Sequence, residues 1–156
     1  MKNFKRILLA SHGTAGALEA EKAALVLCAD GAHIMHLVVV PEFWKGMVGK
    51  DWLNNPKGGS DLDSYVESQL EKEIRQQIAR LKQAASRKKI KYSCEVIVGS
   101  PAETMIETAK SGKYDIAVIG SPRPRGKKGL RSRMDLDVIA RDLDIPIMII
   151  PFPSTG

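Results

Sequence analysis

Apolar residues along this chain gather in five short runs that are separated by longer, more polar stretches. The runs are rich in Val, Ile and Leu and are bounded by glycine, proline or charged residues, a pattern typical of strands in a buried sheet. We therefore expect strands at Ile7–Ala10, Ile34–Val40, Tyr92–Val98, Ile116–Ile119 and Ile147–Ile150.

The stretches between these runs carry apolar residues at helical spacing. The clearest can be capped by Asp61 or Ser64 and repeats an apolar residue every three or four positions as far as Ala85. We expect three further helices: one capped by Thr14, passing Ala29 and ended by Gly31; one capped by Ser100, opened by Pro101 and ended by Gly112; and one from about Met134 to Leu143.

Strands that alternate with helices predict an α/β fold, a parallel sheet covered by helices on both faces. The 156 residues form one domain, 1–156, with a long connection at 41–61. From the residues alone, strand orders 3-2-1-4-5 and 2-1-3-4-5 both remain open. The choice matters because ligands bind beyond the strand ends where the order reverses. The first order puts that crevice between Ser11-His12-Gly13 and Gly120-Ser121, whereas the second would involve Gly99-Ser100.

A basic loop leaves the end of the fourth run. Between Gly120 and Arg133 lie three glycines, two prolines and six basic side chains, so the segment is irregular and positively charged. This stretch resembles the carboxy-terminal signature of the universal stress protein family. Gly120 and Ser121 match its first glycine and the residue after it, and Gly126 and Gly129 match positions that are often glycine in the family.

The resemblance covers nearly the full length and implies a single five-stranded parallel doubly wound sheet of order 3-2-1-4-5. It also implies ATP as a ligand, but three signature positions depart from the pattern. Arg123 and Arg133 replace glycines that let backbone amides approach phosphates, and Met134 replaces a Ser or Thr. His12 stands where relatives usually carry an Asp that helps to hold the adenosine. We therefore expect weak or absent ATP binding.

The resulting hypothesis is a regulatory domain of the stress response that binds a small anionic or nucleotide-like ligand in a modified pocket. Arg123 and Arg133 would hold the anion, with Ser121 and Thr14 as hydroxyl donors. The alternative is an interaction or scaffold domain that binds no nucleotide and acts through its dimer surface and the 41–61 loop. The candidate ligand-binding residues are Ser11, His12, Gly13, Thr14, Val38, Gly120, Ser121, Arg123, Gly126, Gly129, Arg133 and Met134.

Partners follow from charge and from exposed apolar residues. The net charge of +6 favours anionic partners. The cluster Arg87-Lys88-Lys89-Lys91 is interpreted as a solvated helix end, and a nucleic-acid function is disfavoured because the basic loop lacks interleaved aromatic residues. Phe43, Trp44 and Trp52 in the 41–61 loop either pack on the domain itself or bind a protein partner. Ile147–Ile150 is apolar on both faces and lies at a sheet edge in the strand order that the resemblance implies. We therefore expect a homodimer through this strand, as the resemblance also implies.

Catalysis and membrane insertion have little support in the sequence. His33 and His36 are three apart on a strand and so face opposite ways, which prevents them from chelating one metal. A Ser11-His12 hydrolase would need an acid to orient the imidazole, and the sequence assigns none. The apolar runs are too short to span a bilayer, and Cys28 and Cys94 form no metal or disulfide framework. We expect a cytoplasmic binding domain with no catalytic residues and no metal site.

Overall fold

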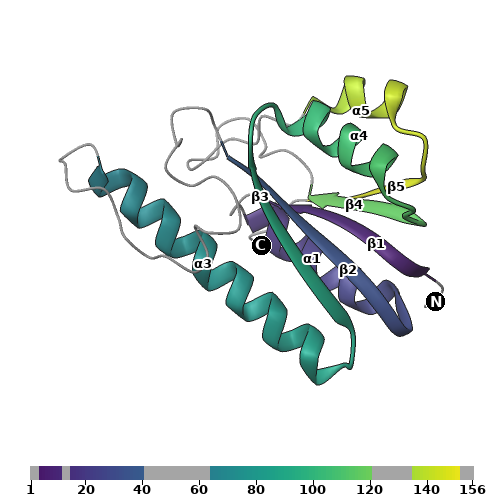
Figure 1. Cartoon of the computed structure of the whole chain (residues 1–156), viewed down its shortest axis with the longest axis horizontal. Coiled ribbons are helices and arrows are strands. Elements are labelled where there is room, and N and C mark those ends of the chain that lie inside the picture. The colour runs from purple at the N-terminus through teal and green to yellow at the C-terminus, as the bar shows by residue number, and fades with distance from the viewer. Residues whose placement is uncertain (1–3, 12–14, 41–63, 121–134, 152–156) are drawn as a thin grey trace.

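A computed structural model describes residues 4–11, 15–40, 64–120 and 135–151 of the chain as a five-stranded parallel sheet with helices (Figure 1). The strand order is β3-β2-β1-β4-β5, as the resemblance predicted. The elements are β1 (Phe4–Ser11), α1 (Ala15–Leu27), β2 (Cys28–Val40), α3 (Ser64–Arg87), β3 (Lys91–Val98), α4 (Pro101–Ser111), β4 (Ile116–Gly120), α5 (Leu136–Asp142) and β5 (Ile147–Ile150).

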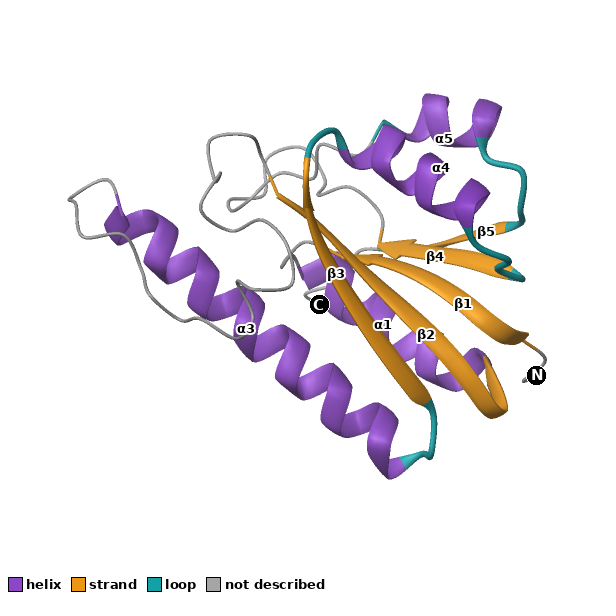
Figure 2. Ribbon diagram, viewed as in Figure 1, coloured by secondary structure: helices purple, strands orange, loops and turns teal. Residues whose placement is uncertain are grey.

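Helices cover the sheet in two layers, with α1 and α3 on one face and α4 and α5 on the other (Figure 2). Side chains of β1 alternate between the two layers. Ile7 and Leu9 join the core formed with α1 and α3, and Leu8 and Ala10 join the core formed with α4 and α5. All four are at most 2% exposed. β1 is therefore buried on both faces, as its continuous apolar run indicated.

The first helix ends earlier than its sequence suggested. α1 stops at Leu27, and β2 begins at Cys28, so Ala29 lies in the strand rather than in the helix. Gly31 does adopt a left-handed conformation, with φ 75°, but within the strand. The pairing of β2 with β1 shifts register there, since Phe4 pairs with Cys28 whereas Arg6 pairs with His33. Gly31 therefore permits an irregularity in β2 instead of terminating a helix.

The α3–β3 junction is a helix C-terminal motif with a lysine in the usual glycine position. The amide of Ile90 donates to the carbonyl of Ala85 at 2.9 Å, and the amide of Lys89 donates to the carbonyl of Ser86 at 3.1 Å. These two bonds define a Schellman motif, in which Lys89 occupies the left-handed position with φ 59°. In the part of the chain that the structure describes, Lys89 is the only residue other than glycine with a positive φ.

Helix α4 follows its sequence signals closely. Ser100 is at the cap, Pro101 opens the helix, and Gly112 follows its last residue. Met105, Ile106 and Ala109 are buried, as their spacing predicted. The Ser100 side chain makes no capping hydrogen bond, so the cap position is right although its expected contact is not formed. Among the described helices, none is both long and apolar enough to cross a lipid bilayer.

Candidate functional site

The strand order predicts a ligand crevice beyond the carboxyl ends of β1 and β4. The order reverses there, since β1 pairs with β2 on one side and with β4 on the other. Ser11 pairs with Val38 of β2, and Ala10 pairs with Ile119 of β4, the neighbour of Gly120. The structure thus brings three candidate residues, Ser11, Val38 and Gly120, to one end of the sheet.

These three residues contribute in different ways. Val38 is buried, with 0% of the residue exposed. Gly120 is half-buried at the last position of β4. The structure describes the strand position of Ser11 but not its side chain. His12, Gly13, Thr14, Ser121, Arg123, Gly126, Gly129, Arg133 and Met134 lie outside the described residues, as do Phe43, Trp44 and Trp52.

Helix α5 begins later than expected and is capped by a carboxylate. α5 starts at Leu136 rather than near Met134, because Asp135 is its cap. One carboxylate oxygen of Asp135 accepts from the amides of Asp137 at 3.1 Å and Val138 at 3.3 Å. Arg133 therefore does not immediately precede the helix. The first-turn amides that could bind a phosphate are bound instead by the chain's own aspartate.

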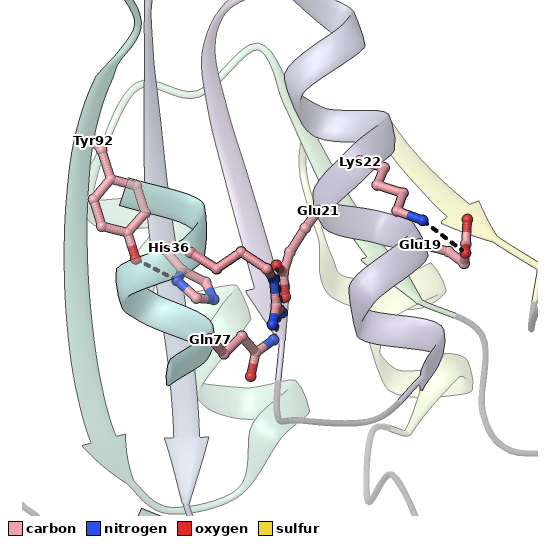
Figure 3. A network of polar contacts seen from close by, with 7 residues as sticks. Glu19, Glu21, Lys22, His36, Gln77 and Tyr92 are labelled. Atoms are coloured by element: carbon pink, nitrogen blue, oxygen red, sulfur yellow. Dashed lines mark hydrogen bonds and ion pairs between the residues drawn. The ribbon is translucent and has the colours of Figure 1, made fainter. Parts of the chain in front are cut away.

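A buried polar group that the sequence reasoning missed joins α1 to α3 (Figure 3). In the sequence Glu21 resembles the surface charges around it on the first helix, yet it is only 2% exposed. Its carboxylate accepts a hydrogen bond from the Gln77 amide and lies 3.2 Å from the Arg80 guanidinium. Burial raises the pKa of Glu21, and the contacts with Gln77 and Arg80 partly counteract that rise.

The second half of this polar group joins β2 to β3. His36 is 0% exposed, and its Nδ1 lies 2.6 Å from the Tyr92 hydroxyl. Burial, and then the positive charge of Arg80, lowers the pKa of His36 to about 3. Burial also raises the pKa of the Tyr92 hydroxyl, so both groups are neutral, and the tautomer of His36 decides which of the two donates.

Both cysteines are shielded thiols rather than reactive groups. Cys28 is buried, and its Sγ lies 3.2 Å from the Ala24 carbonyl. Cys94 on β3 is half-buried and is the register partner of His36. Burial raises the pKa of Cys28 to about 11 and that of Cys94 to about 11. Such thiols are protonated at neutral pH and are poor nucleophiles.

The two histidines of β2 face opposite sides of the sheet, as their spacing indicated. His33 contacts Ser93 at 2.8 Å, whereas His36 contacts Tyr92, the residue before Ser93. Among the described residues, no three His, Cys, Asp or Glu side chains lie close enough together to hold a metal ion. The sequence gives a reason to expect a buried polar contact for His36, because His36 interrupts an apolar run. Nothing in the sequence distinguishes Glu21 from Glu19, which is partly exposed and pairs with Lys22 at 3.6 Å.

Comparison of the sequence with family models places the chain in a family. The universal stress protein family model matches residues 3–151. The chain belongs to the universal stress protein family. No match was found among curated proteins.

Solved structures with this fold include proteins with adenine nucleotides. UspA from Lactobacillus plantarum is 16% identical, with 96% of this chain and 99% of that chain covered and a TM-score of 0.64. A family protein from Arabidopsis thaliana with AMP bound is 12% identical, with 96% and 93% covered and a TM-score of 0.63. A universal stress protein in complex with cAMP is 15% identical, with 96% and 98% covered and a TM-score of 0.58. At these identities the likeness shows the shared fold.

Proposed function

We propose that this universal stress protein is a regulatory domain of the stress response that binds a small anionic or nucleotide-like ligand in the crevice between β1 and β4. The observation that carries the proposal is the reversal of strand order between Ser11 and Gly120, the place where parallel sheets bind ligands. Two proteins of the same fold hold AMP and cAMP, which supports a nucleotide-like ligand.

The same site disfavours the triphosphate of ATP. Arg123 and Arg133 stand at glycine positions of the signature, where a Cβ obstructs close approach of a phosphate to the backbone. The amides at the start of α5 are already bound by Asp135, and Asp137 adds a second carboxylate in the first turn. A ligand with less negative charge than ATP, held by arginine side chains, fits these features better.

Calorimetry with ATP, AMP, cAMP and sulfate tests the proposal. We expect AMP, cAMP or sulfate to bind and ATP to bind more weakly than micromolar. Arg123→Ala/Arg133→Ala should abolish the binding, while the control Lys82→Ala/Arg141→Ala, which removes two exposed cations of α3 and α5, should leave it unchanged. Micromolar or tighter ATP binding would refute the exclusion of ATP. Absence of binding by all four ligands would favour the scaffold function.

The scaffold alternative rests on the exposed edge of the sheet. β5 is an edge strand, and its Ile149 is 42% exposed, one of two large hydrophobic side chains that are exposed in the described part of the chain. A homodimer through Ile147–Ile150 would cover it. The dimer is compatible with either function, so the calorimetric result, rather than the oligomeric state, distinguishes them. For both functions we propose a cytoplasmic location, which suits the two free thiols.

A further inference from the structure

Basic side chains from three parts of the sequence gather at the amino-terminal end of the strands, opposite the proposed ligand crevice. Figure 2 shows the α3–β3 turn, the starts of β2 and β1, and the α4–β4 connection along one side of the molecule. We call this the basic edge and define it by six exposed residues: Arg6, Arg87, Lys88, Lys89, Lys91 and Lys113. The sequence suggested only the α3–β3 part of it.

Strand register makes this edge continuous. Arg6 pairs with His33, and His33 pairs with Lys91, so the three residues lie side by side across β1, β2 and β3. Registered residues of neighbouring strands point to the same face, and two strand spacings of about 4.8 Å separate Arg6 from Lys91. Arg6 also contacts the backbone of the next basic residue, because its Nε donates to the Lys113 carbonyl at 2.6 Å. The spacing is close to a Debye length of about 8 Å, so the fields of these cations add.

The cations of the basic edge have no carboxylate partner among the described residues. The ion pairs among the described residues join Glu19 to Lys22 and Glu21 to Arg80, and none of these four residues belongs to the basic edge. Asp115 lies beside Arg6, but its carboxylate accepts from the backbone amides of Lys5 at 2.9 Å and Arg6 at 3.0 Å. The guanidinium therefore forms no ion pair with Asp115. The charges of Asp115 and of the exposed Asp30 at the start of β2 reduce the positive potential of the edge, but its six cations outnumber these two carboxylates.

Two further observations concern the same edge. Lys89 keeps a left-handed backbone where glycine would be free of strain, which is unusual at a position that only ends a helix. His33 reports the local positive field: burial, then Arg6, then Lys91, lowers its pKa. An anion bound at this edge would counteract the two cationic contributions and raise the pKa of His33.

We propose that the basic edge binds a nucleic-acid duplex through its phosphate backbone, without reading its bases. The edge offers closely spaced charges and little else. In the described part of the chain, the large hydrophobic residues that are exposed are Ile149, on β5, and Val26, at the end of α1 just before β2 begins. Val26 is a single apolar side chain beside the edge, not an apolar patch. The edge has no apolar patch that could insert into an anionic membrane, and none that could form the apolar centre of a protein–protein interface.

Single-stranded nucleic acid fits this edge less well than a duplex does. None of the six residues that define the edge is aromatic, so it offers no platform on which unpaired bases could stack. Tyr114 follows Lys113 but is half-buried, and one face of its ring is occupied by the Arg6 guanidinium, 5.4 Å from the ring centroid. Phosphate contact with a duplex is therefore the mode that the edge supports best.

Fluorescence anisotropy with a mixed-sequence DNA duplex of about 20 base pairs, over a series of salt concentrations, tests the proposal. We expect affinity to fall steeply with salt and to be independent of base sequence. Lys89→Gln/Lys91→Gln should reduce the slope of log affinity against log salt by about two, one for each phosphate that is no longer neutralised. Lys89→Gln keeps the Cβ, so the strain at this position does not change. Lys22→Gln/Lys72→Gln is the matched control, because it removes the same charge from exposed positions on α1 and α3.

A second measurement locates the binding surface. Titration of the His33 imidazole by NMR should give a higher pKa when the duplex is present than when it is absent. A duplex that does not bind, or an equal reduction of slope in both double variants, would overturn the proposal. So would binding to phosphatidylserine vesicles without binding to the duplex, which would assign the edge to a membrane surface. The outcome does not depend on the ligand crevice, because the variants lie at the opposite end of the strands.

Discussion

Lys89 carries a backbone strain that a single substitution can remove. For a residue with a Cβ, the left-handed conformation costs roughly 1–2 kcal/mol, whereas glycine adopts it freely. Part of the gain is cancelled because glycine makes the unfolded chain more flexible. We expect Lys89→Gly to raise the free energy of unfolding by about 0.5–1 kcal/mol, measured by urea denaturation.

The control for this prediction is Lys89→Ala. Alanine removes the same positive charge but keeps the Cβ, so the left-handed strain remains. The alanine variant should therefore have nearly the stability of the parent protein. If both variants are stabilised equally, relief of charge repulsion along Arg87–Lys91, rather than relief of backbone strain, is the cause.

His36 predicts a loss of stability in mild acid. The pKa of this imidazole is about 3 in the folded protein, against an ordinary value of 6.5, so the unfolded chain binds a proton more readily. The contribution of neutral His36 to the free energy of unfolding is therefore complete above pH 6.5 and is lost as the pH falls toward 3. The upper limit of the loss is about 1.4 kcal/mol per pH unit. Urea denaturation from pH 7 to 4.5 measures it.

Glu21 acts in the opposite direction within part of that range. Its pKa is raised by burial above the ordinary value of 4.5, so the folded protein binds a proton here more readily than the unfolded chain. The stabilising contribution of Glu21 is present below pH 4.5 and is lost as the pH rises through its folded pKa. His36→Gln should flatten the acid dependence between pH 6.5 and 4.5, and Glu21→Gln should steepen it. An unchanged slope in His36→Gln would contradict the prediction.

Among the elements, those with complete local signals were predicted best. α4 was foreseen from Ser100, Pro101 and Gly112 because cap, first turn and end each have a distinct residue type. The end of α1 was wrong because a glycine with positive φ fits a helix end and a strand irregularity equally well, and Gly31 serves the second. The start of α5 was misplaced for a similar reason, since Met134 fits the apolar spacing but Asp135 makes the cap.

The start of α5 gives a prediction of its own. Asp135→Asn keeps a side-chain oxygen for the amides of Asp137 and Val138 but removes the negative charge at the start of α5. If a ligand phosphate lies near this end of α5, the affinity for an anionic nucleotide should rise about two- to fivefold, the effect of roughly 0.3–1 kcal/mol. Calorimetry measures the change. Asp142→Asn, at the far end of the same helix, should have no effect, and equal gains in both variants would contradict a local interaction.

At the scale of the molecule, the alternation of strands and helices predicted the α/β class, but it left the strand order open. The order came from the family resemblance, because hydrophobic pattern does not say which neighbours a buried strand has. The candidate site was predictable to the extent that Ser11 and Gly120 end neighbouring strands. The buried group around Glu21 and the basic edge were not predictable, since each joins residues that are far apart in the sequence.

The edge of the sheet predicts how the molecule assembles. β5 has a neighbour on one side only, and its Ile149 is 42% exposed. We expect a homodimer at micromolar concentration, and Ile149→Lys should convert it to a monomer by placing a charge in the interface. Light scattering measures the mass. Val26→Lys is the matched control, because Val26 on α1 is 64% exposed and its replacement should leave the dimer intact. A monomeric parent protein, or a dimer in both variants, would contradict this interface.

The two shielded thiols can be used to measure local unfolding of the native protein. Cys28 lies where α1 turns into β2, and Cys94 lies on β3 beside His36, so they lie in two different regions of the sheet. Each thiol must become accessible and lose its proton before it can attack a disulfide reagent. In the folded protein both thiols react slowly, because the pKa of each is about 11. The rate at which each sulfur is labelled in the native protein therefore measures how often the region around that cysteine opens. Equal rates would mean that the domain opens as one cooperative unit, and unequal rates would show which part separates first.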